Sequence, residues 1–238
     1  MSIQTEVTKE TLLHTIRSEL AGMNLTTNEY IQLANAILDA AIEKKQSNGA
    51  ADGWHETEAI TALPARSGDI IIRSFNQKND IPLLKKWTED TAGKEFLLSR
   101  VENSSPGVEQ LVENKNNHFG IVCNPQEEPI GIVGFLNYDK KQKKAELRKL
   151  IGEKAMRGLG FGKKAARLWI SYGIHALQLR KIYLYTFDTN LRNIRINEDL
   201  GFKLEGIYRA ENIINSVPKD IIRMGLLIGD PPRSSADK

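Results

Sequence analysis

Three glycines within seven residues give this 238-residue chain its most chemically informative spacing. The stretch reads Arg157-Gly158-Leu159-Gly160-Phe161-Gly162-Lys163, between an expected strand over 145–151 and a helical pattern that reaches residue 177. Glycine allows positive φ angles and close approach of the backbone to a ligand. Because backbone N–H groups in such a loop and at a helix N-terminus attract anions, we expect a pyrophosphate site at 157–163.

Two common nucleotide motifs do not fit this stretch. The Walker pattern requires Gly at position 157 and Ser or Thr after Lys163, where the chain has Arg157 and Lys164. The dinucleotide fingerprint G-x-G-x-x-G fails because Gly162 comes one residue too early, and no acidic residue clearly takes the ribose role. The loop therefore indicates a different phosphate-bearing ligand.

The spacing Arg157-x-x-Gly160-x-Gly162 resembles the (Gln/Arg)-x-x-Gly-x-(Gly/Ala) loop of the GNAT superfamily of acetyl-CoA-dependent N-acetyltransferases. A second similarity follows downstream, where the expected strand 181–187 leads to an Asn and to a helix that ends in Leu-Gly-Phe at 200–202.

A third similarity lies near the start of the main domain. The strand expected at 69–75 carries Arg73 and is followed by Asp80-x-Pro82, which resembles the branch with ribosomal-protein, spermidine, aminoglycoside and amino-sugar acetyltransferases.

This resemblance implies acetyl-CoA as co-substrate. Its pyrophosphate would be bound by the loop, and its pantetheine arm would insert between two strands that splay apart. A backbone N–H near the end of the first of these strands would polarise the thioester carbonyl. Asn190 matches the family Asn that contacts the cofactor arm, and a helix N-cap explains that position equally well. The candidate cofactor-binding residues are Leu150, Ile151, Gly152, Arg157, Gly158, Leu159, Gly160, Phe161, Gly162, Lys163, Asn190 and Asn193.

The resemblance is weakest for proton transfer. Many family members carry a Tyr that protonates the leaving thiolate, and the matching position here is Asn197, which cannot do so. Either another residue or water must then protonate the thiolate. Tyr208 is our candidate residue, although aromatic packing also explains it and its neighbours Tyr183 and Tyr185.

Glu146, on an expected strand, is the first candidate base, because a buried carboxylate can acquire a suitable pKa. An exposed strand charge opposite a Lys is the alternative. His118 is the second candidate base. No His/Cys cluster has the spacing of metal ligands, so we expect no metal.

Composition is that of an ordinary globular protein with a net charge of +3. Cys123 is the single cysteine, so no internal disulfide can form. We see neither a membrane-spanning stretch nor a secretory signal, and no dense Lys/Arg run. We therefore expect a cytoplasmic protein that binds neither membranes nor nucleic acid.

The surrounding pattern predicts an α+β type of α/β domain, with a twisted, mostly antiparallel sheet flanked by helices and preceded by a small helical hairpin. We expect a helical extension over 1–52, a linker over 53–67, the acetyltransferase domain over 68–229 and a disordered tail over 230–238. Within the domain, we expect helices at 95–101 and 108–115, strands at 118–123, 130–138 and 144–151, and a final hairpin of 203–209 and 221–227 with an irregular connection.

The predicted function is transfer of an acetyl group from acetyl-CoA to a primary amine of a small molecule, with an amino sugar or sugar nucleotide favoured. A protein N-terminal amine or a polyamine is the enzymatic alternative. A non-catalytic, acyl-CoA-binding interaction module is the second alternative, and a homodimer is possible.

Overall fold

The computed structural model describes residues 59–89, 108–187, 190–214 and 216–228, together with 18–20 and 22–23. The chain divides into two compact units, 1–50 and 51–238. In the first unit, residues 18–20 and 22 are helical, within the predicted helical extension. The rest of that extension, the helix expected at 95–101 and the predicted tail lie outside the described residues.

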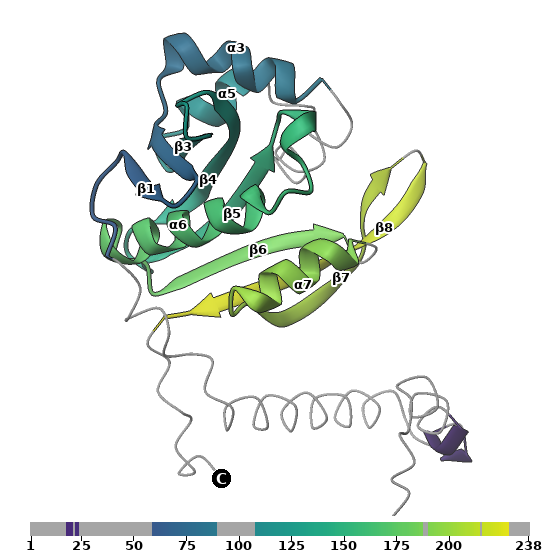
Figure 1. The fold of residues 1–238 in the computed structure, drawn as a ribbon. Helices are drawn as coiled ribbons and strands as arrows, with labels where there is room; N and C mark the ends of the chain where they lie inside the picture. Colours follow the sequence, from purple (N-terminus) through teal and green to yellow (C-terminus); the bar gives the residue numbers. More distant parts are fainter. Residues whose placement is uncertain are drawn as a thin grey trace, which may run out of the picture. The chain divides into compact units, whose positions relative to one another are not determined.

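The described part of the second unit is built on one eight-stranded sheet with the order β1-β2-β3-β4-β5-β6-β8-β7 (Figure 1). Its neighbours pair antiparallel except β5 and β6, so the predicted mixed, mostly antiparallel architecture is confirmed. The strands are β1 Ala65–Ser67, β2 Ile70–Ser74, β3 His118–Cys123, β4 Pro129–Asp139, β5 Lys144–Ile151, β6 Lys181–Phe187, β7 Lys203–Ile214 and β8 Val217–Leu227.

Helices cover both faces of this sheet. They are α3 Gln77–Trp87, α5 Val108–Glu113, the short 3₁₀ helix η2 Lys154–Met156, α6 Phe161–His175 and α7 Leu191–Asp199. The apolar side chains of α6, and those around α7, pack into one core with one side of the sheet, which we call the α6 face. Those of α3 and α5 pack on the opposite side, which we call the α3 face. Among the described residues, no helix is long and apolar enough to span a membrane.

β5 separates the two cores by simple alternation, because successive side chains of a strand point to opposite faces. Ala145 and Leu147 belong to the core on the α6 face, whereas Leu150 belongs to the core on the α3 face. A side chain of β5 is therefore assigned to one face by its position alone.

Two features differ from the predictions. The described part of the predicted linker, 59–67, contributes β1 to the sheet and buries Ile60 in the core, so structured chain begins before residue 68. The connection expected between the last two strands is itself paired, because β7 and β8 continue until Ile214 pairs with Val217, and the irregularity is a register shift between Tyr208 and Asn212. The hairpin is longer than its apolar segments, since backbone pairing continues through polar sequence.

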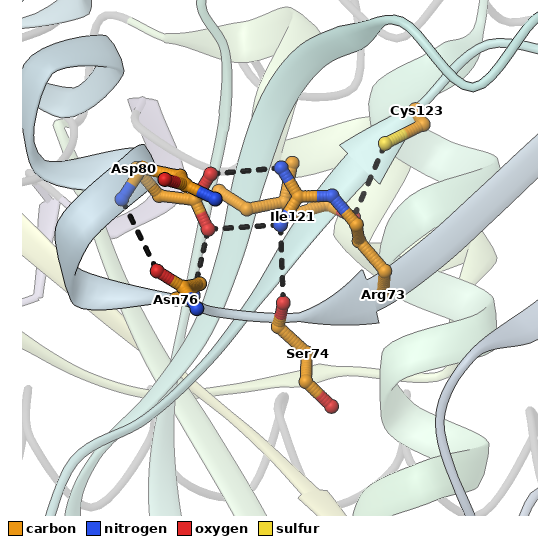
Figure 2. Close-up of polar contacts among 7 residues, drawn as sticks. Arg73, Ser74, Asn76, Asp80, Ile121 and Cys123 are labelled. Atoms are coloured by element: carbon orange, nitrogen blue, oxygen red, sulfur yellow. Dashed lines mark hydrogen bonds and ion pairs between the residues drawn. The ribbon is translucent and has the colours of Figure 1, made fainter.

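Arg73 and Asp80 join the first long strand to α3 (Figure 2). Two guanidinium nitrogens of Arg73 donate to the two Asp80 oxygens at 2.8 and 2.7 Å, and the Asn76 backbone N–H donates to Asp80 at 2.7 Å. Asp80 is fully buried. Hydrogen bonding to this carboxylate raises the pKa of Arg73.

Replacing the carboxylate should destabilise the domain. In Asp80→Asn the charge is lost and one oxygen becomes a donor facing other donors, so we expect the free energy of unfolding to fall by about 2 kcal/mol or more. Urea unfolding followed by tryptophan fluorescence measures this. The matched control is Glu127→Gln, which removes the charge from the exposed Arg66–Glu127 pair and should change stability little. Equal effects of the two substitutions would contradict the proposed role of Asp80.

Candidate active site

The sheet opens between β5 and β6. The two strands pair at only three positions, the last of which joins Glu146 to Tyr183, although β5 continues to Ile151 and β6 to Phe187. Beyond that point, β5 stays paired with β4, and β6 with β8, so the two halves of the sheet diverge (Figure 1). The predicted splay of these two strands is therefore present, and we call it the β5–β6 opening.

The register shows which backbone groups face this opening. The N–H of Gly152 donates to the Ile130 carbonyl of β4 at 2.9 Å. Because hydrogen-bonding directions alternate along an antiparallel ladder, the N–H groups of Leu150 and Gly152 point toward β4, and those of Lys149 and Ile151 point into the opening. Of the three residues predicted to bind pantetheine through the backbone, Ile151 thus has the required direction.

Gly152 has a separate packing role at this end of β5. A Cβ atom at this position would lie 2.1 Å from the Trp87 ring of α3. The Trp87 indole N–H donates to Glu153 at 2.9 Å, which holds the strand end against α3. Glycine is required here by close packing.

The glycine loop leads from β5 into the N-terminus of α6. Gly158 and Gly160 have φ angles of 86° and 89°, and Gly160 is the N-cap of α6 with no side-chain cap. A Cβ atom on Gly160 would meet nothing within 4 Å. The Lys163 N–H donates to the Gly160 carbonyl at 3.1 Å, whereas the earlier N–H groups of α6 have no carbonyl one turn before them. A helix N-terminus with free space beside it is what a pyrophosphate needs, so the loop fits the expected ligand.

The charged side chains of the loop are engaged within the protein. Arg157 donates from Nε to the Ile151 carbonyl at 2.8 Å and from Nη2 to the Gly152 carbonyl at 3.0 Å, which anchors the loop to β5. Lys163 forms an exposed ion pair with Asp199 of α7 at 2.7 Å. The backbone of the loop is therefore the better candidate for phosphate binding than these two side chains. In the same loop, Leu159 and Phe161 are apolar, and Leu159 is 61% exposed.

Asn190 and Asn193 contribute to the start of α7. The Asn190 side chain accepts from the Asn193 backbone N–H at 3.2 Å, so the N-cap interpretation is confirmed. The Asn193 amide donates to Thr186 of β6 at 3.2 Å. Contact of either Asn with a cofactor remains a prediction.

Glu146 lies on the α3 face at the apex of the opening. It is only 4% exposed, and it accepts from Arg148 at 2.6 Å and from the Asn137 amide at 3.3 Å. The alternative of an exposed charge opposite a Lys is therefore wrong. The carboxylate is held by a buried ion pair at the point where the strands separate.

Tyr208 belongs to an aromatic cluster on the same face. The Tyr185 ring packs edge-to-face on Tyr183 and on Tyr208, with centroids 5.8 and 5.9 Å apart. The Arg223 guanidinium lies 4.5 Å from the centroid of Tyr183, and its Nη1 is 3.4 Å from the hydroxyls of Tyr185 and Tyr208. This packing accounts for Tyr208 without a role in proton transfer, which stays a prediction.

His118 lies at the start of β3, where its ring packs edge-on against Tyr138 at 5.2 Å. Partial burial lowers the pKa of His118. A neutral imidazole is compatible with a base, but its role also stays a prediction.

Sequence reasoning missed Lys149. Its side chain points to the α6 face, and its Nζ donates to the Asn197 side-chain oxygen at 2.5 Å. Burial lowers the pKa of Lys149 to about 8. The alternation of side chains along β5 could have identified it. Ala145, Leu147 and Ile151 lie on one apolar side of the strand, and Lys149 lies on the same side.

The loop geometry gives a matched test of ligand binding. Gly160 and Gly68 both have positive φ angles and both leave open space for a Cβ atom. Changing either to Ala should cost about 1 kcal/mol of stability through backbone strain. We expect Gly160→Ala alone to weaken acetyl-CoA binding, measured by calorimetry, because only there must a phosphate approach the backbone. An unchanged affinity in Gly160→Ala would overturn the assignment of the loop.

Comparison with known proteins agrees with this geometry. The family model described as an acetyltransferase (GNAT) domain matches residues 69–203, which is more than half of the chain. The probable N-acetyltransferase YjcK of Bacillus subtilis (strain 168) is 31% identical over 112 residues, which cover 47% of this chain and 62% of that protein. The matched region thus spans less than two thirds of that relative.

Two spermidine acetyltransferases are also similar. The spermidine N(1)-acetyltransferase of Escherichia coli (strain K12) is 27% identical over 146 residues, covering 61% of this chain and 74% of that protein. The crystal structure of spermidine N-acetyltransferase from Vibrio cholerae, in complex with CoA and spermine, superposes with a TM-score of 0.60 at 22% identity. That match covers 68% of this chain and 96% of the other, and shows a shared fold. With its glycine loop, its β5–β6 opening and the family match over 69–203, this chain belongs to the GNAT acetyltransferase family.

Proposed function

We propose that this protein transfers the acetyl group of acetyl-CoA to a primary amine of a small molecule. The observation that carries the proposal is the β5–β6 opening, which has the loop and the N-terminus of α6 at its wide end and the buried Glu146 at its apex. The opening thus offers an anion site that could bind the acetyl donor and a carboxylate that could accept the proton of the amine.

Acetyl-CoA would supply the activated acetyl group. The N–H groups at the start of α6 would bind its pyrophosphate, assisted by the helix dipole. The N–H groups of Lys149 and Ile151, directed into the opening, would bind the pantetheine arm and polarise the thioester carbonyl. The positions of these groups are set by pairing of β5 with β4, so they are preorganised before any ligand binds.

Glu146 would receive the amine. Its two oxygens already accept hydrogen bonds from Arg148 and Asn137, and a carboxylate has about four acceptor sites. The unused sites can accept an amine N–H, orient the nitrogen toward the opening and take up the proton that it loses on acylation. Arg148 would serve as a positioning residue that fixes the carboxylate.

A polyamine is the acceptor that we now favour. The E. coli relative is named a spermidine N(1)-acetyltransferase, and the V. cholerae structure is described as a complex with CoA and spermine. The relatives reported above give no support to the amino sugar or sugar nucleotide that we had favoured from sequence, so the polyamine alternative takes first place.

We also propose that the protein self-associates. Another structure of spermidine N-acetyltransferase from V. cholerae, 21% identical in sequence to our chain, is described as dodecameric. Light scattering of the purified chain tests the proposal, and the homodimer expected from sequence is one possible result.

An acceptor panel tests the proposed function. Release of CoA thiol would be measured with spermidine, spermine, glucosamine and a peptide with a free N-terminus, and we expect the two polyamines to react fastest. Preference for the peptide or the amino sugar would exclude the polyamine. Binding of acetyl-CoA without turnover of any amine would favour the interaction module.

Glu146→Gln should lower turnover about 10²- to 10⁴-fold, because the amide can neither take up the proton nor attract an ammonium. Affinity for acetyl-CoA, measured by calorimetry, should remain within about twofold, since Glu146 lies at the apex of the opening, whereas the loop follows the far end of β5. Glu127→Gln at the exposed Arg66 pair is the control. Wild-type turnover in Glu146→Gln would show that Glu146 is not the base.

A further inference from the structure

Lys149 and Asn197 link the two sides of the β5–β6 opening on the α6 face. Lys149 lies on β5 three residues beyond the last position paired with β6, and Asn197 lies on α7, the helix that follows β6. The 2.5 Å contact between Lys149 Nζ and the Asn197 oxygen is made between largely buried side chains, and Asn197 is 0% exposed. The backbone N–H of the same Lys149 points into the opening, so this residue borders the path expected for the thioester.

Asn197 is rigidly placed and incompletely satisfied. The end of α7 is closed by hydrogen bonds from the Phe202 N–H to the Asn197 carbonyl at 3.0 Å and from the Gly201 N–H to the Glu198 carbonyl at 2.9 Å. Because an ammonium can only donate, Asn197 must present its side-chain oxygen to Lys149. Its Nδ2 is then buried with no hydrogen-bond partner in the described part of the chain.

Burial accounts for the lowered pKa of Lys149. The charged groups of the surrounding elements are directed elsewhere. Those of β5, the loop, α6 and α7 are the buried pair Glu146–Arg148 on the other face, Arg157 bound to the carbonyls of β5, the pair Lys163–Asp199, and Lys164 bound to Asp69. The others are the partly exposed Lys144 and His175 and the exposed Arg167, Arg192, Arg195 and Glu198.

Acetyl transfer requires a proton donor for the departing CoA sulfur. When the amine nitrogen bonds to the acetyl carbon and the carbon–sulfur bond breaks, sulfur keeps the electron pair and must take up a proton. Asn197 has no acidic proton to give, and Tyr208 packs in the cluster on the opposite face. The Lys149 ammonium has three protons and uses one toward Asn197.

We propose that Lys149 is a catalytic residue that donates this proton to the departing CoA sulfur, and that Asn197 is a positioning residue that holds its ammonium. Lys149 becomes a neutral amine in this step and regains a proton from water, while the proton lost by the acylated nitrogen passes to Glu146 or to water. This inference rests on the proposed function.

The acidity of the group suits the task. An ordinary thiol has a pKa of about 8.5, so the pKa of about 8 for Lys149 lies close to that of the thiol it would protonate. Proton transfer between groups of similar pKa is efficient near neutral pH. An exposed lysine, with a pKa near about 10.4, would be a poorer acid.

The first test uses bound CoA and requires no turnover. The ultraviolet absorbance of the thiolate would be followed against pH for free CoA, and for CoA bound to the wild type, to Lys149→Met and to Lys144→Met on the same strand. If Lys149 lies beside the sulfur, the wild type and Lys144→Met should lower the pKa of the bound thiol by about one to three units, and Lys149→Met should not.

Binding of desulfo-CoA distinguishes loss of the site from loss of the ammonium. Lys149→Met should bind desulfo-CoA as the wild type does, with a similar melting temperature, because Met fills the same apolar side of β5. Equal thiol pKa values in wild type and Lys149→Met would overturn this inference and leave the proposed function intact. Failure of the wild type to bind CoA at all would overturn the proposed function.

The pH profile supplies a second readout, in a variant of almost unchanged shape. An acid must be protonated to act, so wild-type kcat should fall as the pH rises through about 8, where Lys149 loses its proton. Asn197→Asp places a negative charge beside the ammonium, raises its pKa and should move this fall upward by about one unit or more. Lys149→Met should lower kcat at least about tenfold and abolish the fall. An unshifted fall in Asn197→Asp would contradict the assignment.

Discussion

The structure depends on one unusual feature of its sheet, the loss of pairing between two neighbouring strands in its interior. Buried backbone N–H and C=O groups require partners, and β5 and β6 leave theirs exposed to each other beyond Glu146 and Tyr183. Part of this demand is met internally, because the Arg157 side chain donates to the carbonyls of Ile151 and Gly152. The N–H groups directed into the opening remain for a ligand that can act as a further strand.

The opening also explains why the functional groups divide between two faces. β5 carries Glu146 to the α3 face and Lys149 to the α6 face by alternation alone. The proposed base for the amine and the proposed acid for the thiolate can therefore act on one acetyl group from opposite sides without neutralising each other. The same strand provides the backbone N–H groups between them, so its pairing with β4 sets the geometry of the whole proposed reaction.

Sequence patterns were informative where the interactions are local. The glycine spacing, the apolar periodicity of α6 and the Asn190 and Gly201 boundaries of α7 each reflect contacts within a few residues, and each was found as expected. Short runs rich in β-branched and aromatic residues, bounded by turns, likewise located β3, β5 and β6 to within a residue. The three-residue β1 was missed because it has no period to detect and is held only by its pairing with β2.

Long-range side-chain contacts could not be read in this way. From sequence, Glu146 could be either a buried base or an exposed strand charge, because its burial and its pairing with Arg148 depend on tertiary packing. The Lys149–Asn197 contact joins residues that are far apart in the chain, and no local spacing reveals it. Asn197 could be identified from sequence as a departure from the family pattern. Its contact with Lys149 of β5, which we propose takes over the proton transfer, required the structure.

Hydrogen–deuterium exchange with and without acetyl-CoA tests the central claim most directly, because it reports on the backbone groups that the opening leaves for a ligand. The account predicts slower exchange at the amides of Lys149 and Ile151 and across residues 158–163 when acetyl-CoA is bound, with β1 and β2 unchanged and with no such effect of ATP or NAD. Protection confined to other parts of the chain, or no protection at saturating acetyl-CoA, would contradict it.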